Sequence, residues 1–259
     1  MSLKLILSSL ALLASPALAV PASATAPNQT KEVAKAAAPG PGAEAQILWK
    51  QYYLFTVNGV AKGYFEETAE RRPKEKQLSV SQRWVETEGG RTETYIGAVA
   101  EDNAKLSPVA FFSERTSAEH AYKIDGRAKG QELSMTFKSA IPPSPPIAKK
   151  TKMKAGTIFS NFVPLYLSKL DPSKGAVRFD AVVEDARDGN FETRAGTALL
   201  QAVKKTIHGQ DCRKARVEFN GQIGEWWIAT DGRLCEFSLP QVKAKLTLAT
   251  EEEAKKALP

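Results

Sequence analysis

Apolar and polar residues alternate along most of the chain from residue 46 onward, a period of two that is typical of β-strands with one buried face. The segment GEWWIATDGRLCEF, residues 224–237, shows this pattern around two adjacent tryptophans. Because successive side chains of a strand point to opposite faces, Trp226 shares a face with Ile228, and Trp227 shares the other with Ala229. We therefore expect Trp226 in the core, and Trp227 to be a candidate contact for a ligand or partner where its face meets solvent.

Turn signals divide the alternating runs into short strands. Asn220-Gly221 and Asp231-Gly232 are typical of two-residue hairpin loops and predict a three-stranded meander over residues 215–237. On this register the apolar face carries Val217, Phe219, Trp226, Ile228, Cys235 and Phe237. Further breaks are expected at Asn58-Gly59, Gly63, Gly89-Gly90, Asp125-Gly126 and Gly130.

These patterns predict a mainly β protein, with a strongly curved antiparallel meander, or half-barrel, over residues 46–259. Two series of strands should be joined by an extended Pro-rich crossing at residues 140–150. One short apolar helix is expected on the concave face, because apolar residues recur there at helical spacing: Phe159, Phe162, Tyr166 and Leu170. Thr250 and Glu253 have capping-box spacing and predict a short C-terminal helix.

The N-terminal segment MSLKLILSSLALLASPALA, residues 1–19, has an early lysine, an apolar run and a small-x-small end, which is the pattern of a secretory signal peptide. Residues 20–45 are rich in alanine and proline and contain no aromatic residue, so we expect a disordered tether. No cysteine follows the predicted cleavage site, and no later segment has the roughly 18 apolar residues of a transmembrane helix. The chain should therefore be exported, soluble after signal cleavage, and periplasmic or extracellular.

The chain carries 36 Lys and Arg residues against 29 Asp and Glu residues, a net charge of +7. The densest basic cluster is formed by Lys149, Lys150, Lys152 and Lys154. This cluster indicates either a solvated linker or a contact with an anionic surface of the cell envelope. Nucleic-acid binding is not expected of an exported chain that lacks a platform of aromatic and basic residues.

Little in the sequence favours catalysis. His120 and His208 lie beside strand-like runs without a catalytic motif, and together with the cysteines they lack the spacing of metal ligands. Paired acids of the glycosidase type would have to come from Asp180, Glu184, Asp185 and Asp188. Because Asp188-Gly189 is better explained as a turn, we predict no enzymatic activity, no metal site and no cofactor.

The chain contains two cysteines, and in an oxidising compartment two cysteines are expected to pair. The register complicates this expectation, since Cys235 falls on the face of Ile228 while Cys212 is out of phase with Val217 and Phe219. A Cys212–Cys235 disulfide is predicted, with Cys212 in a loop after Gly209, and free thiols are the alternative.

The order of meander, Pro-rich crossing, apolar helix and Trp-Trp hairpin resembles that of exported bacterial proteins with an incomplete β-barrel. These are the lipoprotein-carrier type and related uncharacterised periplasmic barrel families. The matching residues are Gly209, Ala215, Val217, Trp227, Asp231 and Gly232, together with YIGAVAEDNAKLSPVAF at residues 95–111. The resemblance implies a half-barrel whose concave face holds a lipid tail or another hydrophobic ligand.

Two functions remain open at this point. The first is a cell-envelope protein that binds a hydrophobic ligand or lipid through Phe159, Phe162, Tyr166 and Trp227. The second is a non-enzymatic structural or interaction module in which the same aromatic side chains simply fill the core. An empty or a close-packed space beneath the helix distinguishes the two.

Overall fold

The computed structural model describes residues 45–87, 90–183 and 193–257. Apart from Ala45, the predicted signal peptide and tether lie outside the described residues, as do the predicted turns at Gly89 and at Asp188-Gly189.

Within the described residues, fifteen strands form one continuous sheet. The first series comprises β1 (Gln46–Val57), β2 (Val60–Arg72), β3 (Gln77–Glu86), β4 (Thr92–Glu101), β5 (Pro108–Thr116), β6 (Ala121–Lys129), β7 (Glu132–Ile141) and β8 (Ile147–Lys152). The second comprises β9 (Ile158–Phe159), β10 (Ala176–Val182), β11 (Thr193–Ile207), β12 (Gln210–Phe219), β13 (Gln222–Ala229), β14 (Leu234–Leu239) and β15 (Ala244–Ala249).

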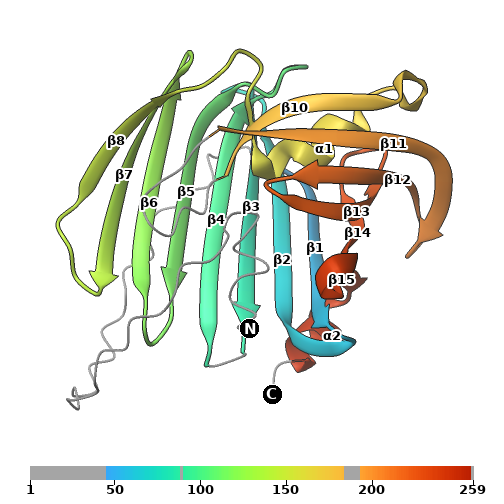
Figure 1. The fold of residues 1–259 in the computed structure, drawn as a ribbon, viewed down its shortest axis with the longest axis horizontal. Helices are drawn as coiled ribbons and strands as arrows, with labels where there is room; N and C mark the ends of the chain where they lie inside the picture. Colours follow the sequence, from blue (N-terminus) through green and yellow to red (C-terminus); the bar gives the residue numbers. More distant parts are fainter. Residues whose placement is uncertain (1–44, 88–89, 184–192, 258–259) are drawn as a thin grey trace.

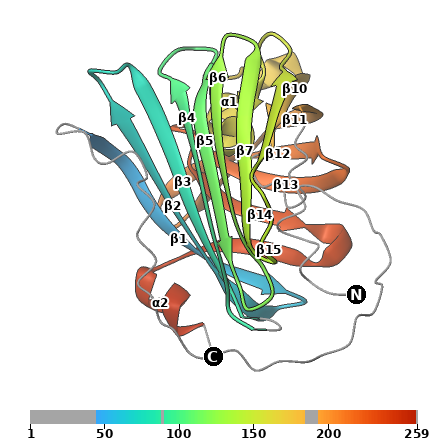
Figure 2. The same cartoon turned by 90° about the vertical axis from the view of Figure 1, so that its left-hand side faces the viewer.

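The sheet is a meander that closes on itself only in part. β1 pairs with both β2 and β15, so the two series join at the middle of the sheet, while β8 and β9 are its two edges. Figure 1 shows β1 to β8 standing roughly upright, with β10 to β13 running across them. Figure 2 shows the two series from the side as two layers, with the strands of one crossing behind those of the other. The predicted curved, mainly β half-barrel is confirmed.

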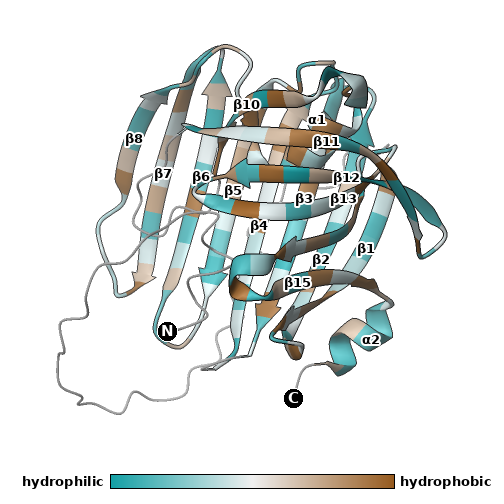
Figure 3. Cartoon of the chain, turned by 45° about the vertical axis from the view of Figure 1, so that its right-hand side comes forward, coloured by the Kyte–Doolittle hydropathy of each residue, from teal (hydrophilic) through white to brown (hydrophobic). Residues whose placement is uncertain are grey.

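The core fills most of the space between the layers, and apolar segments recur on the strands of both (Figure 3). Its largest fully buried side chains include Tyr53 and Phe65 from the first layer and Phe159 and Phe162 from the segment between the layers. Burial of such aromatic side chains is the main contribution that holds the two layers together.

The predicted apolar helix is shorter than expected. Phe159 belongs to β9, where it pairs with Val182 in a parallel arrangement, and a 3-10 turn (Ser160–Phe162) separates it from helix α1 (Val163–Ser168). The prediction of a single helix from Phe159 to Leu170 was wrong. In a segment this short, apolar residues at helical spacing do not distinguish a helix from a strand followed by a turn. A second 3-10 turn, Pro172–Lys174, follows and is capped by the side chain of Asp171.

The C-terminal helix is confirmed as α2 (Glu251–Lys256). The Thr250 side chain accepts a hydrogen bond from the backbone N–H of Glu253, and the Glu253 carboxylate accepts one from the backbone N–H of Thr250 at 2.8 Å. This is the predicted capping box. Another short 3-10 turn, Pro240–Val242, connects β14 to β15.

The predicted hairpin turn at Asn220-Gly221 and the predicted break at Asn58-Gly59 are both two-residue hairpin loops. Asn58-Gly59 has φ values of 51° and 77°, and Asn220-Gly221 has 53° and 74°, as a type I′ turn requires. The prediction for Asp231-Gly232 was wrong in type, because only Gly232 has a positive φ, at 93°, and four residues separate β13 from β14.

Gly63 and Asp125-Gly126 were expected to interrupt strands, but they lie inside β2 and β6. At both positions a neighbouring group occupies the place of a side chain. A Cβ on Gly63 would lie 2.0 Å from the carbonyl oxygen of Val85, and one on Gly126 would lie 1.9 Å from the Phe111 ring. These glycines therefore permit close packing rather than turns.

We expect Gly63→Ala to lower the free energy of unfolding by about 2 kcal/mol, because the obstructing group is backbone that is fixed in the β2–β3 ladder. Gly97→Ala is the control. Its Cβ would lie 2.1 Å from the ring of Phe112, which is half-buried and can rotate away at a cost below about 1 kcal/mol. Urea denaturation of both variants measures the difference, and equal costs would contradict this account.

The Pro-rich segment differs from the prediction in its C-terminal part. Residues 147–152 form the edge strand β8, which pairs with β7, so this part of the expected linker is sheet. The chain crosses to the second series only after Lys152, later than the predicted 140–150. The proline run itself forms the connection between β7 and β8, which suits residues that cannot donate to a ladder.

Candidate functional site

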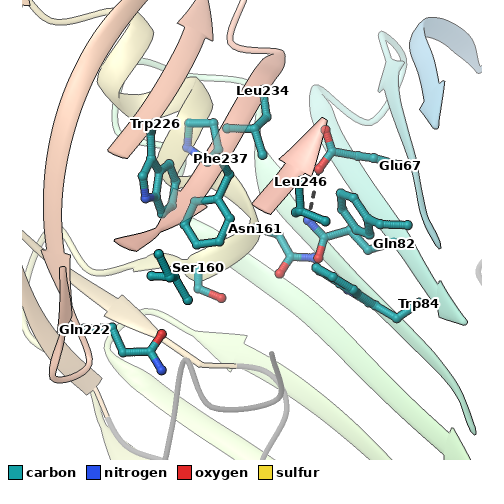
Figure 4. A pocket seen from close by; sticks show the side chains of 13 residues that line it. Glu67, Gln82, Trp84, Ser160, Asn161, Gln222, Trp226, Leu234, Phe237 and Leu246 are labelled. Carbon is teal, nitrogen blue, oxygen red and sulfur yellow. Dashed lines mark hydrogen bonds between the residues drawn. The ribbon is translucent and has the colours of Figure 1, made fainter. Parts of the chain in front are cut away.

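A pocket with a cavity volume of about 90 Å³ lies between the two layers (Figure 4). The first layer contributes residues of β2 and β3, and the second contributes residues of β13, β14 and β15. The turn before α1 contributes Ser160 and Asn161, and α1 itself contributes Pro164. The complete lining is Phe65, Glu67, Gln82, Trp84, Ser160, Asn161, Pro164, Gln222, Trp226, Leu234, Phe237, Leu239 and Leu246.

Aromatic pairs form two sides of the pocket. On the first layer, Phe65 and Trp84 are cross-strand neighbours with ring centroids 4.2 Å apart. On the second layer, Trp226 and Phe237 are cross-strand neighbours at 5.6 Å, with their rings nearly perpendicular at 87°. In Figure 4, Trp226 and Phe237 lie on one side, and Glu67, Gln82 and Trp84 lie on the other. Alternation places all of these side chains on the inner face of their strands.

Glu67 is the one ionisable residue among the described residues that line the pocket. Its side chain points inward because it alternates with Phe65 and Ala69, and only 5% of the residue is exposed. The Trp49 indole N–H donates to Oε1 at 3.1 Å, and the Gln82 amide donates to Oε2 at 3.0 Å. Both donors are neutral, so they orient the carboxyl group and stabilise a charge on it only in part.

Burial raises the pKa of the Glu67 carboxyl above its ordinary value of 4.5, and the hydrogen bonds from Gln82 and Trp49 oppose this shift only in part. The shift arises because a buried carboxylate loses its hydration. A group whose pKa is higher in the folded state stabilises the fold below its unfolded pKa, and this contribution is lost as the pH rises through the folded pKa.

We therefore expect the stability of the wild type to decline, relative to Glu67→Gln, as the pH rises from 4.5 through the raised pKa of Glu67. The glutamine keeps the shape and a hydrogen-bonding carbonyl but never ionises. Denaturation midpoints of both proteins over a series of pH values measure the divergence. Parallel pH profiles would show that Glu67 does not titrate differently in the folded state.

The three aromatic residues predicted to lie on the apolar helix and bind a ligand do not line this pocket. Phe159 and Phe162 are fully buried in the core, and Phe159 packs edge-on against Phe111 at a centroid distance of 5.5 Å. Tyr166 is half-buried and lies 6.4 Å from the ring of Phe179. Their neighbours Ser160, Asn161 and Pro164 face the pocket instead.

The two tryptophans point apart, as the alternation predicts, and Trp226 is the one that lines the pocket. Trp227 lies half-buried on the outer face, packed against the buried cluster that contains both cysteines. The ammonium groups of Lys205 and Lys214 lie over its ring, at 5.7 and 5.9 Å from the centroid. Much of the surface that we predicted for a ligand is thus covered by this chain's own lysines.

The predicted disulfide between Cys212 and Cys235 is present. Cys212 lies in β12 rather than in a loop, and it pairs with Ala229 of β13. The prediction for the face of Cys235 was wrong. A register shift between Trp227 and Ile228 inserts a bulge, which turns Cys235 to the outer face, where Cys212 and Ala229 lie. Strict alternation in the sequence places the two cysteines on opposite faces of the sheet, and the bulge brings them to the same face.

A wider hollow of about 890 Å³ is lined by residues of strands β4 to β8 and by the adjoining ends of β2 and β3. Its lining includes four cationic residues and one acid: Arg72, Arg127, Lys149, Lys150 and Asp125. Of the predicted basic cluster, Lys150 pairs with Glu132 at 2.8 Å, and Lys154 pairs with Asp180 at 3.2 Å. Lys152 is exposed at the end of β8. Contact of this cluster with an anionic surface stays a prediction.

Of the four acids considered for catalysis, only Asp180 lies within the described residues, and it pairs with Lys154. His120 and His208 are exposed and lie next to different strands, while Glu184, Asp185 and Asp188 lie outside the described residues. In the described part of the chain, no three His, Cys, Asp or Glu side chains gather as a metal site requires. None of the helices that the structure describes has the length and apolar character needed to cross a membrane.

Glu67 and the pocket were missed by our sequence analysis. A signal does exist, because polar residues occupy the inward phase of three neighbouring strands: Gln51 in β1, Glu67 in β2 and Gln82 in β3. They are cross-strand neighbours, and Gln51 and Glu67 are buried. A polar row among apolar neighbours departs from the alternation that the rest of these strands follow.

The partly closed, curved sheet defines the chain as a β-barrel-like protein. No family model and no curated protein matches its sequence. Its fold is similar to that of a solved β-barrel-like protein of the domain of unknown function DUF1849 from Brucella abortus. The two share 10% sequence identity and a TM-score of 0.53, and the match covers 77% of this chain and 94% of the other. At this identity the likeness concerns the fold, and a lipoprotein-carrier function is not part of it.

Proposed function

We propose that the protein is a non-enzymatic binding protein of the cell envelope that takes a hydrophobic or amphipathic ligand into the pocket between its two layers. The observation that carries this proposal is the lining, in which apolar and aromatic side chains from both layers surround a few polar groups. This combination is characteristic of small-molecule sites, where apolar walls supply affinity and a few polar groups fix the orientation.

The size of the pocket limits what enters it. Its volume of about 90 Å³ is well below the roughly 300–1,000 Å³ of a site that encloses a drug-sized molecule. We therefore propose that one compact group of the ligand is inserted while the rest of the ligand stays outside the layers. A carrier that buries whole acyl chains is not favoured by this volume.

Export is part of the same proposal. The signal-peptide pattern of residues 1–19 and the Cys212–Cys235 disulfide both suit an oxidising compartment, such as the periplasm or the extracellular space. Mass spectrometry of the mature protein tests it. A chain that begins at Val20 is the expected product, and a retained leader would refute export by cleavage.

Native mass spectrometry of the protein purified from its own cell envelope tests ligand binding. We expect a co-purifying ligand mass in the wild type and in Trp227→Ala, and its loss in Trp226→Ala. The two variants remove the same side chain from adjacent positions, and only Trp226 lines the pocket. A bare chain in every case would favour the filled structural module, which the complete burial of Phe159 and Phe162 supports.

A further inference from the structure

The charge of Glu67 has no counterpart nearby in the described structure. Its only hydrogen-bond donors there are the neutral side chains of Trp49 and Gln82. No ion pair joins it to a described cation, and no lysine, arginine or histidine is among the described residues that line the pocket. A buried carboxylate without a cation is costly, so a ligand that brings a positive charge would relieve the cost.

The walls around Glu67 also suit a cation. Phe65 and Trp84 belong to one layer and Trp226 and Phe237 to the other, so that aromatic rings meet the pocket from two sides. Aromatic faces carry partial negative charge and attract ammonium groups within about 6 Å of the ring centroid. Rings that surround a small space beside a carboxylate are the chemistry by which proteins bind alkylated ammonium ions.

From the aromatic walls, the unpaired carboxyl group and the small volume together, we infer that the group inserted into the pocket is a compact alkylammonium ion, such as the trimethylammonium head of an amphipathic ligand. This inference rests on the proposed binding function and specifies the chemical class of its ligand. An anionic or bulky head group is disfavoured by the carboxyl and by the cavity of about 90 Å³.

Binding of a cation should be linked to the proton on Glu67. The empty pocket favours the neutral carboxyl because of burial, whereas the bound cation favours the carboxylate. Affinity should therefore weaken on acidification through the raised pKa of Glu67, and binding should release a proton. A neutral ligand would show neither effect.

Choline and 3,3-dimethyl-1-butanol form a matched pair of probes, because they have the same shape and differ in the charge on the central atom. Tryptophan emission reports the binding, because Trp84 and Trp226 line the pocket. Isothermal calorimetry measures the affinity independently of the tryptophans. We expect the wild type to bind choline at least tenfold more tightly than the alcohol. Glu67→Gln should lose this preference and keep its affinity for the alcohol.

Glu66→Gln is the control for charge, because Glu66 is the sequence neighbour of Glu67 and pairs with Lys50 at 3.1 Å outside the pocket. It should bind both probes like the wild type. Trp226→Leu should lose choline binding and Trp227→Leu should keep it, which tests the aromatic wall without touching Glu67.

The outcomes separate this inference from the function on which it rests. If the alcohol binds as tightly as choline and Glu67→Gln changes neither affinity, the ammonium inference is overturned while the hydrophobic pocket stands. If neither probe binds and the purified protein carries no ligand mass, both are overturned. Choline binding that survives Trp226→Leu also overturns the inference, because it would place the cation elsewhere.

Discussion

Replacing Phe162 by alanine should lower the free energy of unfolding by about 3–5 kcal/mol, the usual cost of removing a buried aromatic ring. Phe162 is fully buried and lies in the turn that connects β9 to α1, so its ring belongs to the core between the layers. A cavity at this position would separate side chains of both layers, and the rigid sheet can collapse around it only in part. Equilibrium unfolding in urea measures the loss.

Two further variants control this experiment. Phe162→Leu keeps an apolar side chain and should cost less than about 1.5 kcal/mol. Tyr166→Ala should cost less than Phe162→Ala, because Tyr166 is only half-buried. If Phe162→Ala retains its stability and loses a co-purifying ligand, then Phe162 is a ligand contact and not a core residue, which is the first of the two functions that the sequence left open.

The overall fold was predictable because its main determinants are local. Alternation along each strand gives the face of a side chain, which is why Trp226 and Trp227 were placed correctly on opposite faces. Asn58-Gly59 and Asn220-Gly221 specify their turns through residues that tolerate positive φ. Thr250 and Glu253 form their capping box within a single helical turn, without help from tertiary contacts.

The errors share a different cause, which is that tertiary neighbours decided the local structure. Gly63 was predicted to break a strand, but it is a glycine because the carbonyl of Val85 on the next strand leaves no room for a side chain. That neighbour cannot be identified from the local sequence. Cys235 changed face because of a bulge in the β13–β14 pairing. Phe159 lies in a strand rather than in the predicted helix because it pairs with Val182 of β10 in a parallel ladder.

The candidate site could not be located from the sequence for the same reason. Glu67 and Trp226 come from opposite halves of the chain. They line the same pocket only because the curved sheet brings the second layer across the first (Figure 1). Aromatic content alone pointed to Phe159 and Phe162, which fill the core. The position of Glu67 on the inward face of its strand is a better indicator of the site. A buried acid requires a functional or structural explanation, whereas a buried aromatic residue does not.

Removing the disulfide by Cys212→Ala together with Cys235→Ala should lower the free energy of unfolding by roughly 3 kcal/mol, as estimated from the entropy of closing a loop of this length. The cysteines are 23 residues apart in the sequence, and the bond joins β12 to β14 across β13. It therefore links β12, β13 and β14, of which β13 carries Trp226 and β14 carries Phe237. The unfolded state gains freedom without the bond, whereas the folded state loses only two sulfur atoms from a small buried cluster that also contains Ile207 and Ala229.

Urea unfolding with and without a reductant measures this contribution on the wild type and on the double variant. The reductant should lower the midpoint of the wild type and leave that of the double variant unchanged, since the variant has no bond to break. Hydrogen exchange should also become faster in β12 to β14 than in β2 to β4, because the bond restrains only the second layer. Equal midpoints for the oxidised and reduced wild type would show that the bond contributes nothing to stability. Uniformly faster exchange in both layers would instead show that the two layers unfold as one cooperative unit.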